Sequence, residues 1–551
     1  MKKGILVLVM AVSVMITGGA MVAGMAAPAM AEMSMTGFVR SLAVTSNYER
    51  YAGTEFFPIK YSESFASTAT SPFNGFFTPS TGGPLTFGNS GEFTLVVPAP
   101  TQAAALFVNT KAGQGSYLET RARIRFEAKE EKVGAVFFFE IDGRWGDSQY
   151  VSGRRNGGFG LEADTINLET KNVYVWFKPV SNMTFNVGLL NYTDYYAGVL
   201  FGGADIAGIV GEAKFEPVDL RFGYGKIKDS TNITVSSSTG APPGQTALTN
   251  GKNQDVDLWF IEAHMSPNKD SRIGLNLHYV NDRGFQQPTS AFSYTINPTN
   301  GINTVTESAL GYDSAKIYTL GLDGSWAINK MFNLSGFAFM QFGDVTNPCY
   351  GPGDCYDGKA KAKGYSVDLR LDVTGAGPGK LFIEGLRVSG QKEDQDDLNG
   401  IWNGSNYANA GALFTRTDME ILLPGALDSN TSQALVYDPK GPSALNSGTG
   451  LGILHFAAGY TMPVAPKLMA KIGLGWAQSA EKWTGTGYQT DKNLGTELNG
   501  KLTYNVAKGL DLQGVAAYLW LGDFYNPGSN EAGVEKGDNL YKLYARLNYA
   551  F

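Results

Sequence analysis

The chain has 551 residues, of which 44 are basic and 51 acidic, giving a formal net charge of −7. Glycine is abundant, at 69 residues, aromatic residues make up 12%, and there are only two cysteines. No linker or shift in composition divides this length. Many short strands joined by glycine-rich turns fit this composition better than several separate cores. The acidic balance argues against nucleic acid as a partner.

Residues 1–31 have the features of a secretory signal peptide. A basic start at Lys2 and Lys3 precedes a mostly apolar stretch and the motif Ala29-Met30-Ala31, which predicts cleavage before Glu32. A single N-terminal membrane anchor is the alternative, but the apolar stretch is short and no basic stop-transfer run follows it. After this segment no run of about twenty apolar residues occurs, so no further transmembrane helix is expected.

Residues 118–126 alternate between apolar or small side chains at even positions and polar ones at odd positions. In a β-strand, side chains two positions apart share a face. The polar face carries Arg121, Arg123 and Arg125, and lipid would oppose each such charge by about 2–4 kcal/mol near the membrane midplane. These arginines are therefore expected to face a water-filled lumen.

The next predicted strand continues the pattern. Glu140, Asp142 and Arg144 occupy its polar phase, between aromatic and aliphatic residues that would face lipid. One interpretation is a wall of opposed charges whose transverse field orders water and sorts solutes. The alternative is a wetted, salt-bridged wall with no part in selectivity.

A series of short motifs follows in order along this part of the chain. They are Tyr117-Leu-Glu-Thr-Arg-Ala-Arg-Ile-Arg-Phe-Glu-Ala128, Val136-Phe-Phe-Phe-Glu-Ile-Asp142, Trp145-Gly146, Asn172-Val-Tyr-Val-Trp-Phe177, Val187-Gly188-Leu189 and Asp205-Ile-Ala-Gly208. In this order they resemble the outer-membrane homotrimeric porins of anaerobic Gram-negative bacteria, over roughly residues 115–230 with the leader and the C-terminal strand. The resemblance implies a homotrimer of channels for small hydrophilic solutes, and it carries over no specific substrate.

A channel of this kind needs a segment folded inward to narrow it. Residues 194–205 follow the fifth predicted strand and combine acidic ends, aromatic residues and glycines. The candidate constriction residues are Asp194, Tyr195, Tyr196 and Asp205. The longer segment 47–116, rich in Phe, Pro, Gly and Ser, could enter the lumen instead, or form an external or intersubunit loop.

Cys349 and Cys355 flank a five-residue turn sequence. In an oxidising compartment this spacing favours a local disulfide, and the lack of nearby histidines disfavours a metal site. Asp368 and Arg370 follow on the polar face of the alternating residues 365–373, and they are further pore-lining candidates.

An acidic cluster opens a later loop and consists of Glu393, Asp394, Asp396, Asp397 and Asn399. Calcium favours such oxygen ligands. Gly400 is one position late for the known twelve-residue calcium loop, so a solvated acidic loop is the preferred interpretation.

The last strand ends the chain on an aromatic residue. Tyr541, Leu547, Tyr549 and Phe551 share its apolar face, and polar residues alternate with them. This pattern resembles the C-terminal recognition signal of outer-membrane barrel proteins, which implies the barrel-assembly machinery as a partner.

The sequence therefore predicts an all-β fold, a transmembrane antiparallel β-barrel of about eighteen strands over residues 32–551, with sixteen as the alternative. Short turns, expected on the periplasmic side, are predicted at 129–132, 180–183, 216–218, 266–271, 329–333, 375–380, 464–467 and 507–510. Long loops, expected outside the cell, are predicted at 47–116, 147–160, 194–205, 230–255, 285–313, 346–364, 395–450, 482–492 and 524–538. A barrel of this size leaves an aqueous channel.

The predicted function is a porin of the bacterial outer membrane, through which small hydrophilic solutes and ions diffuse passively. The three histidines, His264, His278 and His455, lie in no nucleophile, metal or haem motif. The sequence therefore predicts no enzyme, no cofactor and no metal. Lipid, solutes and further copies of the chain are the expected partners.

Three alternatives remain open. A substrate-selective channel would need an aromatic track in the lumen, and Tyr174 and Trp176, which share a strand face, are the one sign of it. A barrel plugged by residues 47–116 would have a structural or surface-binding role. A conduit that sheathes a cytochrome would copurify with haem.

Overall fold

The computed structural model describes most of the chain after the leader. The described residues are 32–47, 59–61, 115–146, 168–229, 231–236, 247–253, 255–283, 285–296, 303–351, 354–355, 357–391, 396–404, 416, 419–423, 451–482, 491–525, 534–536 and 538–551. The predicted signal peptide and nearly all of segment 47–116 lie outside this part.

Long antiparallel strands form one closed ring. In chain order they are β1 (Glu32–Ser46), β3 (Gly115–Lys129), β4 (Val133–Arg144), β5 (Glu169–Val180), β6 (Met183–Tyr192), β7 (Ala204–Phe215), β8 (Val218–Lys228), β11 (Val256–Asn268), β12 (Ser271–Asp282), β15 (Ser314–Ala327), β16 (Phe332–Thr346), β20 (Tyr365–Ala376), β21 (Gly379–Val388), β22 (Ile453–Ala465), β23 (Leu468–Ser479), β24 (Asn493–Ala507), β25 (Leu510–Leu521) and β27 (Leu540–Ala550). β1 pairs with β3 on one side and with β27 on the other, so the ring has no open edge. The prediction of 18 strands is confirmed, and the alternative of sixteen strands is wrong.

The remaining strands are short pieces or hairpins within the connections. They are β2 (Ile59–Tyr61), β9 (Thr231–Ser236), β10 (Ala247–Asn253), β13 (Phe285–Ile296), β14 (Asn303–Tyr312), β17 (Cys349–Gly351), β18 (Asp354–Cys355), β19 (Lys359–Lys361) and β26 (Val534–Lys536), with a short helical turn at Asp523–Tyr525. One of them, β19, also pairs with β16 of the ring. β9 pairs with β10, β13 with β14 and β17 with β18, so three connections expected as loops contain hairpins instead.

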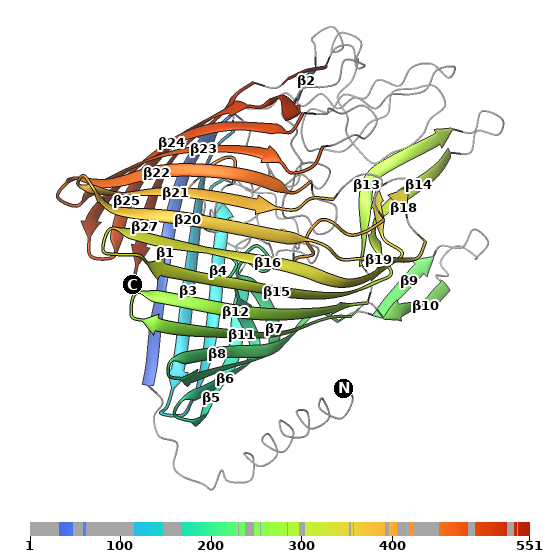
Figure 1. The fold of residues 1–551 in the computed structure, drawn as a ribbon, viewed down its shortest axis with the longest axis horizontal. Coiled ribbons are helices and arrows are strands. Elements are labelled where there is room, and N and C mark those ends of the chain that lie inside the picture. Colours follow the sequence, from blue (N-terminus) through green and yellow to red (C-terminus); the bar gives the residue numbers. More distant parts are fainter. Residues whose placement is uncertain are drawn as a thin grey trace.

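Short and long connections lie at opposite ends of the barrel (Figure 1). The eight predicted short turns all fall between consecutive ring strands, for example β3 to β4 and β24 to β25. The hairpins β9–β10 and β13–β14 project from the other end. An even number of antiparallel strands also returns the C-terminus to the short-turn end.

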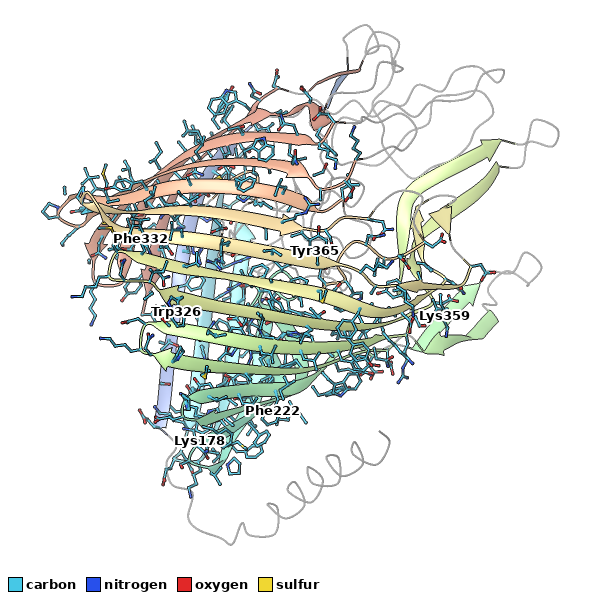
Figure 2. All side chains as sticks on the ribbon, viewed as in Figure 1. Lys178, Phe222, Trp326, Phe332, Lys359 and Tyr365 are labelled. Atoms are coloured by element: carbon cyan, nitrogen blue, oxygen red, sulfur yellow. The ribbon has the colours of Figure 1, made fainter. Side chains whose placement is uncertain are left out.

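The outer surface is apolar because alternate side chains point away from the ring. On β12, Ile273, Leu275 and Leu277 are 38–54% exposed, whereas the intervening Asn276 and His278 are buried. Aromatic residues lie toward both rims, as Trp326 and Tyr365 show in Figure 2. An apolar band between aromatic girdles is the surface that outer-membrane barrels present to lipid. No helix within the described ranges is long and apolar enough to cross a membrane.

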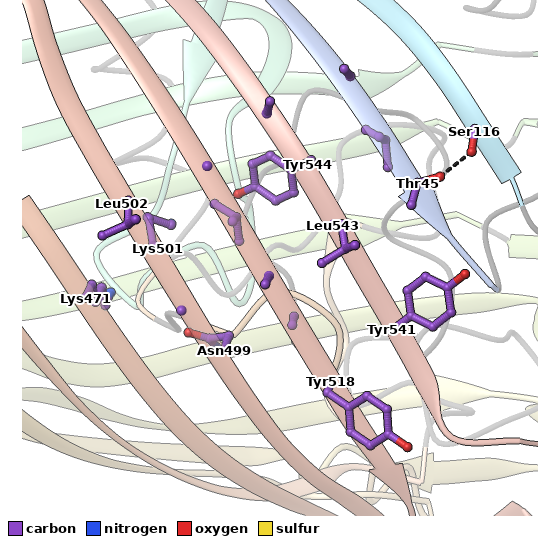
Figure 3. Close-up of a pocket in the computed structure, with 18 of the residues that line it drawn as sticks. Thr45, Ser116, Lys471, Asn499, Lys501, Leu502, Tyr518, Tyr541, Leu543 and Tyr544 are labelled. Carbon is purple, nitrogen blue, oxygen red and sulfur yellow. Dashed lines mark hydrogen bonds between the residues drawn. The ribbon is translucent and has the colours of Figure 1, made fainter.

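One part of the outer wall is hollowed. The hollow, of about 1450 Å³, lies over β23, β24, β25, β27, β1 and β3. Small residues such as Gly500, Gly514, Ala516 and Ala545 form part of its lining. Larger residues around it include Leu502, Leu543, Tyr518 and Tyr541, and the hydroxyls of Thr45 and Ser116 are hydrogen-bonded there (Figure 3).

The barrel interior is not simply water-filled, because parts of two connections fold into it. Buried residues of these connections, among them Tyr196, Trp402 and Leu422, form one hydrophobic cluster with inward-facing wall residues such as Phe260 and Phe339. The prediction that segment 395–450 is an external loop is therefore wrong for its described residues. The reason is that the wall offers apolar side chains on its inner face, and these residues are buried against them.

Candidate channel lining and inward-folded segments

The first inward segment comprises residues 193–203, between β6 and β7. It is organised around the Asp194 carboxylate, which is 5% exposed. That carboxylate accepts backbone N–H groups at 2.6–3.0 Å from Tyr196, Gly198, Leu200 and Phe201. Burial raises the pKa of Asp194, while hydrogen bonds from the backbone and the nearby His278 oppose the rise. One side chain thus satisfies four donors of a turn that strand pairing cannot satisfy.

Tyr196 fixes this segment to the inner wall. Its ring packs against Phe337 and Phe339 of β16 at centroid distances of 5.7 and 4.8 Å. Gly321 of β15 leaves the necessary space, because a Cβ there would lie 2.7 Å from the Tyr196 hydroxyl. Burial and the Asp194 carboxylate raise the pKa of the Tyr196 phenol, so its hydroxyl keeps its proton.

Tyr195 lies on a polar surface of the same wall. Its ring is 4.0 Å from the ring of His264. The guanidinium groups of Arg221 and Arg272 lie 4.5 and 4.9 Å from its centroid. Asp205, by contrast, is part of β7, where it pairs with Lys171 at 2.8 Å instead of joining the inward segment.

A buried polar network underlies the segment, and sequence reasoning did not find it. The Tyr192 hydroxyl donates to Glu262 at 3.0 Å and lies 2.8 Å from Nε2 of His278. Arg221 binds Glu262 and donates to the carbonyl of Thr193 at 2.9 Å. All the side chains in this network occupy the inward-facing positions of their strands. The alternation of each strand could therefore have predicted that they face the lumen. Their mutual proximity depends on which strands become neighbours.

The second inward segment is made of residues 396–404, 416 and 419–423, which belong to the connection between β21 and β22. Its Trp402 is fully buried, and the indole N–H donates to the Tyr312 hydroxyl at 2.8 Å. Gly404 N–H donates to the carbonyl of Leu200 at 2.9 Å, so the two inward segments touch. The first segment follows β6 and the second follows β21, on opposite sides of the ring, so chain from both sides meets inside the barrel.

Contacts to three charged residues of the wall hold residues 416 and 420–422 of the second segment. Glu497 of β24 accepts the backbone N–H groups of residues 420, 421 and 422 at 2.7–2.9 Å. Lys501 of the same strand pairs with Glu420 at 3.0 Å. Arg416 pairs with Asp368 of β20 at 2.8 Å. The predicted lumen residue Asp368 is therefore on the inner wall, with its carboxylate buried.

The arginines of β3 line a different part of the ring. Arg123 binds Glu140, whose carboxylate also lies 3.7 Å from Arg121. Arg125 pairs with Glu127 at 2.9 Å and donates to the Tyr174 hydroxyl at 3.4 Å. The structure thus brings Arg121 and Arg123 together with Glu140, and Arg125 together with Glu127. The side chains of Asp142 and Arg144 lie outside the described residues.

The remaining candidates occupy separate places. Arg370 pairs with Glu384 at 2.9 Å on the inner wall. Trp176 donates to Glu127 at 3.0 Å, so it belongs to the arginine surface of β3 and not to an aromatic row.

The cysteines lie opposite one another. The backbone of Cys349 pairs with that of Cys355 in the hairpin β17–β18. Opposite residues of antiparallel strands have the Cα separation that a disulfide needs. Their side chains lie outside the described part, and the disulfide stays a prediction.

The acidic cluster is partly described. Asp397 pairs with Lys363 at 2.5 Å and accepts the N–H of Lys361 at 2.7 Å. Within the described ranges no group of acidic, histidine or cysteine side chains could hold a metal ion. Glu393 and Asp394 lie outside those ranges.

The C-terminal strand closes the ring. Leu547, Tyr549 and Phe551 are 39–47% exposed on the outer face, with Tyr541 on the same side. Phe551 and Gly37 exchange two backbone hydrogen bonds of 3.0 Å.

A closed ring with an apolar outer face and a charged inner face defines an outer-membrane β-barrel of porin architecture.

No family model matches this chain, and no curated protein matches it. Solved structures to which it is similar include three with 9–10% identity. OccAB4 of Acinetobacter baumannii has 9% identity, a TM-score of 0.46, and 95% of this chain and 98% of that one covered. OccK8 (OprE) of Pseudomonas aeruginosa has 10% identity, a TM-score of 0.47 and coverage of 94% and 98%. The outer membrane protein opdK of Pseudomonas aeruginosa has 9% identity, a TM-score of 0.44 and coverage of 94% and 98%.

Proposed function

We propose that this protein is a passive diffusion channel for small hydrophilic solutes and ions. The observation that carries the proposal is the opposite character of the two faces of one closed ring. The outer face is apolar, whereas the inner face carries charged side chains that remain partly exposed, such as Arg123 and Arg272. Water must reach such charges, because their desolvation in a dry interior would be costly. No turnover chemistry is part of this proposal.

A selective channel is the second candidate, and the two inward segments favour it. Their contact between Gly404 and Leu200 brings chain from opposite sides of the ring together inside the lumen. A narrow passage discriminates by size and charge more strongly than an open pore does.

The first test is single-channel conductance of the refolded protein in a planar bilayer. The expected result is stepwise current, with uptake of sugars into liposomes falling steeply as sugar size increases. Heat-modifiable migration in a gel is the control for a folded barrel. A folded barrel that passes neither ions nor sugars would contradict the proposal and favour a plugged, structural role.

We further propose a homotrimer, cleavage of a leader formed by residues 1–31, and recognition of the C-terminal strand by the barrel-assembly machinery. The resemblance of residues 115–230 to homotrimeric porins supports the first. The hollow in the outer wall also supports it, since small residues such as Gly514 and Ala516 let a neighbouring wall approach closely. The outward aromatic end of the last strand supports the third.

A further inference from the structure

Most ion pairs of the inner wall share one orientation. Five of them come from different parts of the ring and the inward segments: Arg123–Glu140, Arg221–Glu262, Arg272–Asp323, Arg416–Asp368 and Lys501–Glu420. In each pair the basic side chain is 20–42% exposed and the acidic one 0–5% exposed. The base therefore meets the water of the lumen, and the acid lies behind it.

Side-chain length explains this orientation for the pairs within the wall. A carboxylate reaches only a short way from the strand, whereas an arginine or lysine carries its charge at the end of a long flexible chain. Glu262 is held beneath Arg221 by the Tyr192 hydroxyl and His278. Asp323 is likewise held by His264 and by Arg272.

Two further carboxylates are covered by backbone. Asp194 accepts four N–H groups of the first inward segment. Glu497 accepts three from the second. Both are buried, so their charge is directed toward those donors and not toward solutes. These two acids thus anchor the inward segments and do not face the passage, whereas Asp396 and Asp397 of the second segment are at least partly exposed.

Some acids depart from this arrangement. In the pair Lys171–Asp205 the acid is the more exposed partner, at 25% against 17%. Glu212 and Asp219 are exposed as well, but they lie next to the short turn between β7 and β8 and therefore at the rim. The described residues that contact the inward segments follow the common orientation.

We infer that the passage is cationic and that the channel prefers small anions, inorganic ions and carboxylates, over cations of the same size. This inference rests on the proposed channel function. An ion inside the lumen interacts most strongly with the nearest charge of each pair, because Coulomb energy falls with distance and water screens the charge behind. The overall charge of −7 would suggest the opposite preference.

Reversal potentials test the inference. The wild-type channel is placed between unequal concentrations of KCl, then of potassium acetate, in a planar bilayer. We expect the sign that reports chloride and acetate as the more permeant ions. Arg123→Gln should lower the chloride-to-potassium permeability ratio about sevenfold, because one unit charge about 7 Å from the ion in water changes the passage of the anion and of the cation about 2.7-fold each, in opposite directions. Glu140 keeps Arg121 as a neighbour at 3.7 Å in this variant.

Two variants separate charge from packing. Arg123→Lys retains the charge and should retain the ratio. Arg387→Gln removes a charge that lies beside the exposed Tyr365 on the outer face, and it should leave the ratio unchanged. A conducting wild-type channel that prefers potassium would overturn the inference and leave the porin proposal standing, as would an unchanged ratio in Arg123→Gln. A folded barrel that passes no current would contradict both the anion preference and the porin proposal.

Discussion

At the scale of single residues, buried carboxylates do most of the organising inside this barrel. Asp194 is the clearest case, because its two oxygens satisfy four backbone donors of one short segment. Hydrogen bonds to a charged acceptor contribute about 1.5–3 kcal/mol each, and a donor left unsatisfied costs about as much. The position of the first inward segment therefore depends on this side chain.

Asp194→Asn tests that dependence. The amide keeps one acceptor oxygen but turns an NH₂ group toward N–H donors. We therefore expect the folded position of the first inward segment to be destabilised by about 2 kcal/mol or more. Hydrogen exchange followed by mass spectrometry should show faster exchange in residues 193–203 and unchanged exchange in the ring strands. Asp205→Asn is the matched control, since that carboxylate lies on β7 and contacts none of these donors. Equal exchange in both variants would refute the role of Asp194.

Sequence reasoning identified the faces of the strands but not the groups that meet across the lumen. The alternation around Arg121, Arg123 and Arg125 was enough to assign them to the inner wall. It could not show that Glu262 contacts His278, because a strand pattern does not specify which strands become neighbours. The selectivity interpretation of the arginines remains a prediction.

At the scale of elements, the two-residue alternation of apolar and polar side chains predicted the strands and the short turns. It did not predict the inward segments. Their sequence has no period, so their apolar runs, such as Ile421-Leu422-Leu423, were indistinguishable from loop residues. A signal was nevertheless present in the wall. Runs such as Trp259-Phe260-Ile261 are apolar on both faces of the strand. A strand between lipid and water needs an apolar outer face only, so an apolar inner face indicates that something packs against it.

The second inward segment also depends on a missing side chain. Gly475 of β23 faces Met419, and the three atoms closest to a Cβ built at this glycine all belong to that methionine. Gly475→Leu should therefore displace the segment at a cost of about 1–3 kcal/mol and leave strand pairing intact. We expect a larger and noisier single-channel conductance.

A second change serves as the control for this prediction. Met419→Ala in the Gly475→Leu background restores the lost space, and it should return the conductance toward the wild-type value. If the single and double variants conduct alike, steric displacement of Met419 is not the cause. Unchanged conductance in the single variant would show that the segment does not narrow the passage.

At the scale of the whole molecule, the outer wall is uneven. The wall around Leu275 is covered by bulky side chains, whereas the hollow lies over β23–β25, β27, β1 and β3. Bulky side chains suit fluid lipid, and small ones permit close approach of a second rigid wall. If copies of the chain contact one another at the hollow, a bulky aromatic side chain introduced there should separate them.

Ala516→Trp is the corresponding change, with Leu275→Trp as a control on the other side of the ring. We expect the first to raise the monomer fraction several-fold in unheated gels and in mass photometry of detergent-solubilised protein, and the second to have no effect. A wild-type protein that is monomeric by both methods would contradict the proposed trimer, and a trimer unaffected by Ala516→Trp would place its contacts elsewhere.

The pairing of β1 with both β3 and β27 also restricts how this barrel could have changed size during evolution. Every neighbour in the ring is antiparallel, so the insertion or loss of one strand would create a parallel pair or an open edge. The circumference can therefore grow or shrink only by whole hairpins. Each short turn marks the tip of such a unit, and relatives of different width should differ by duplications or deletions that begin and end between these units.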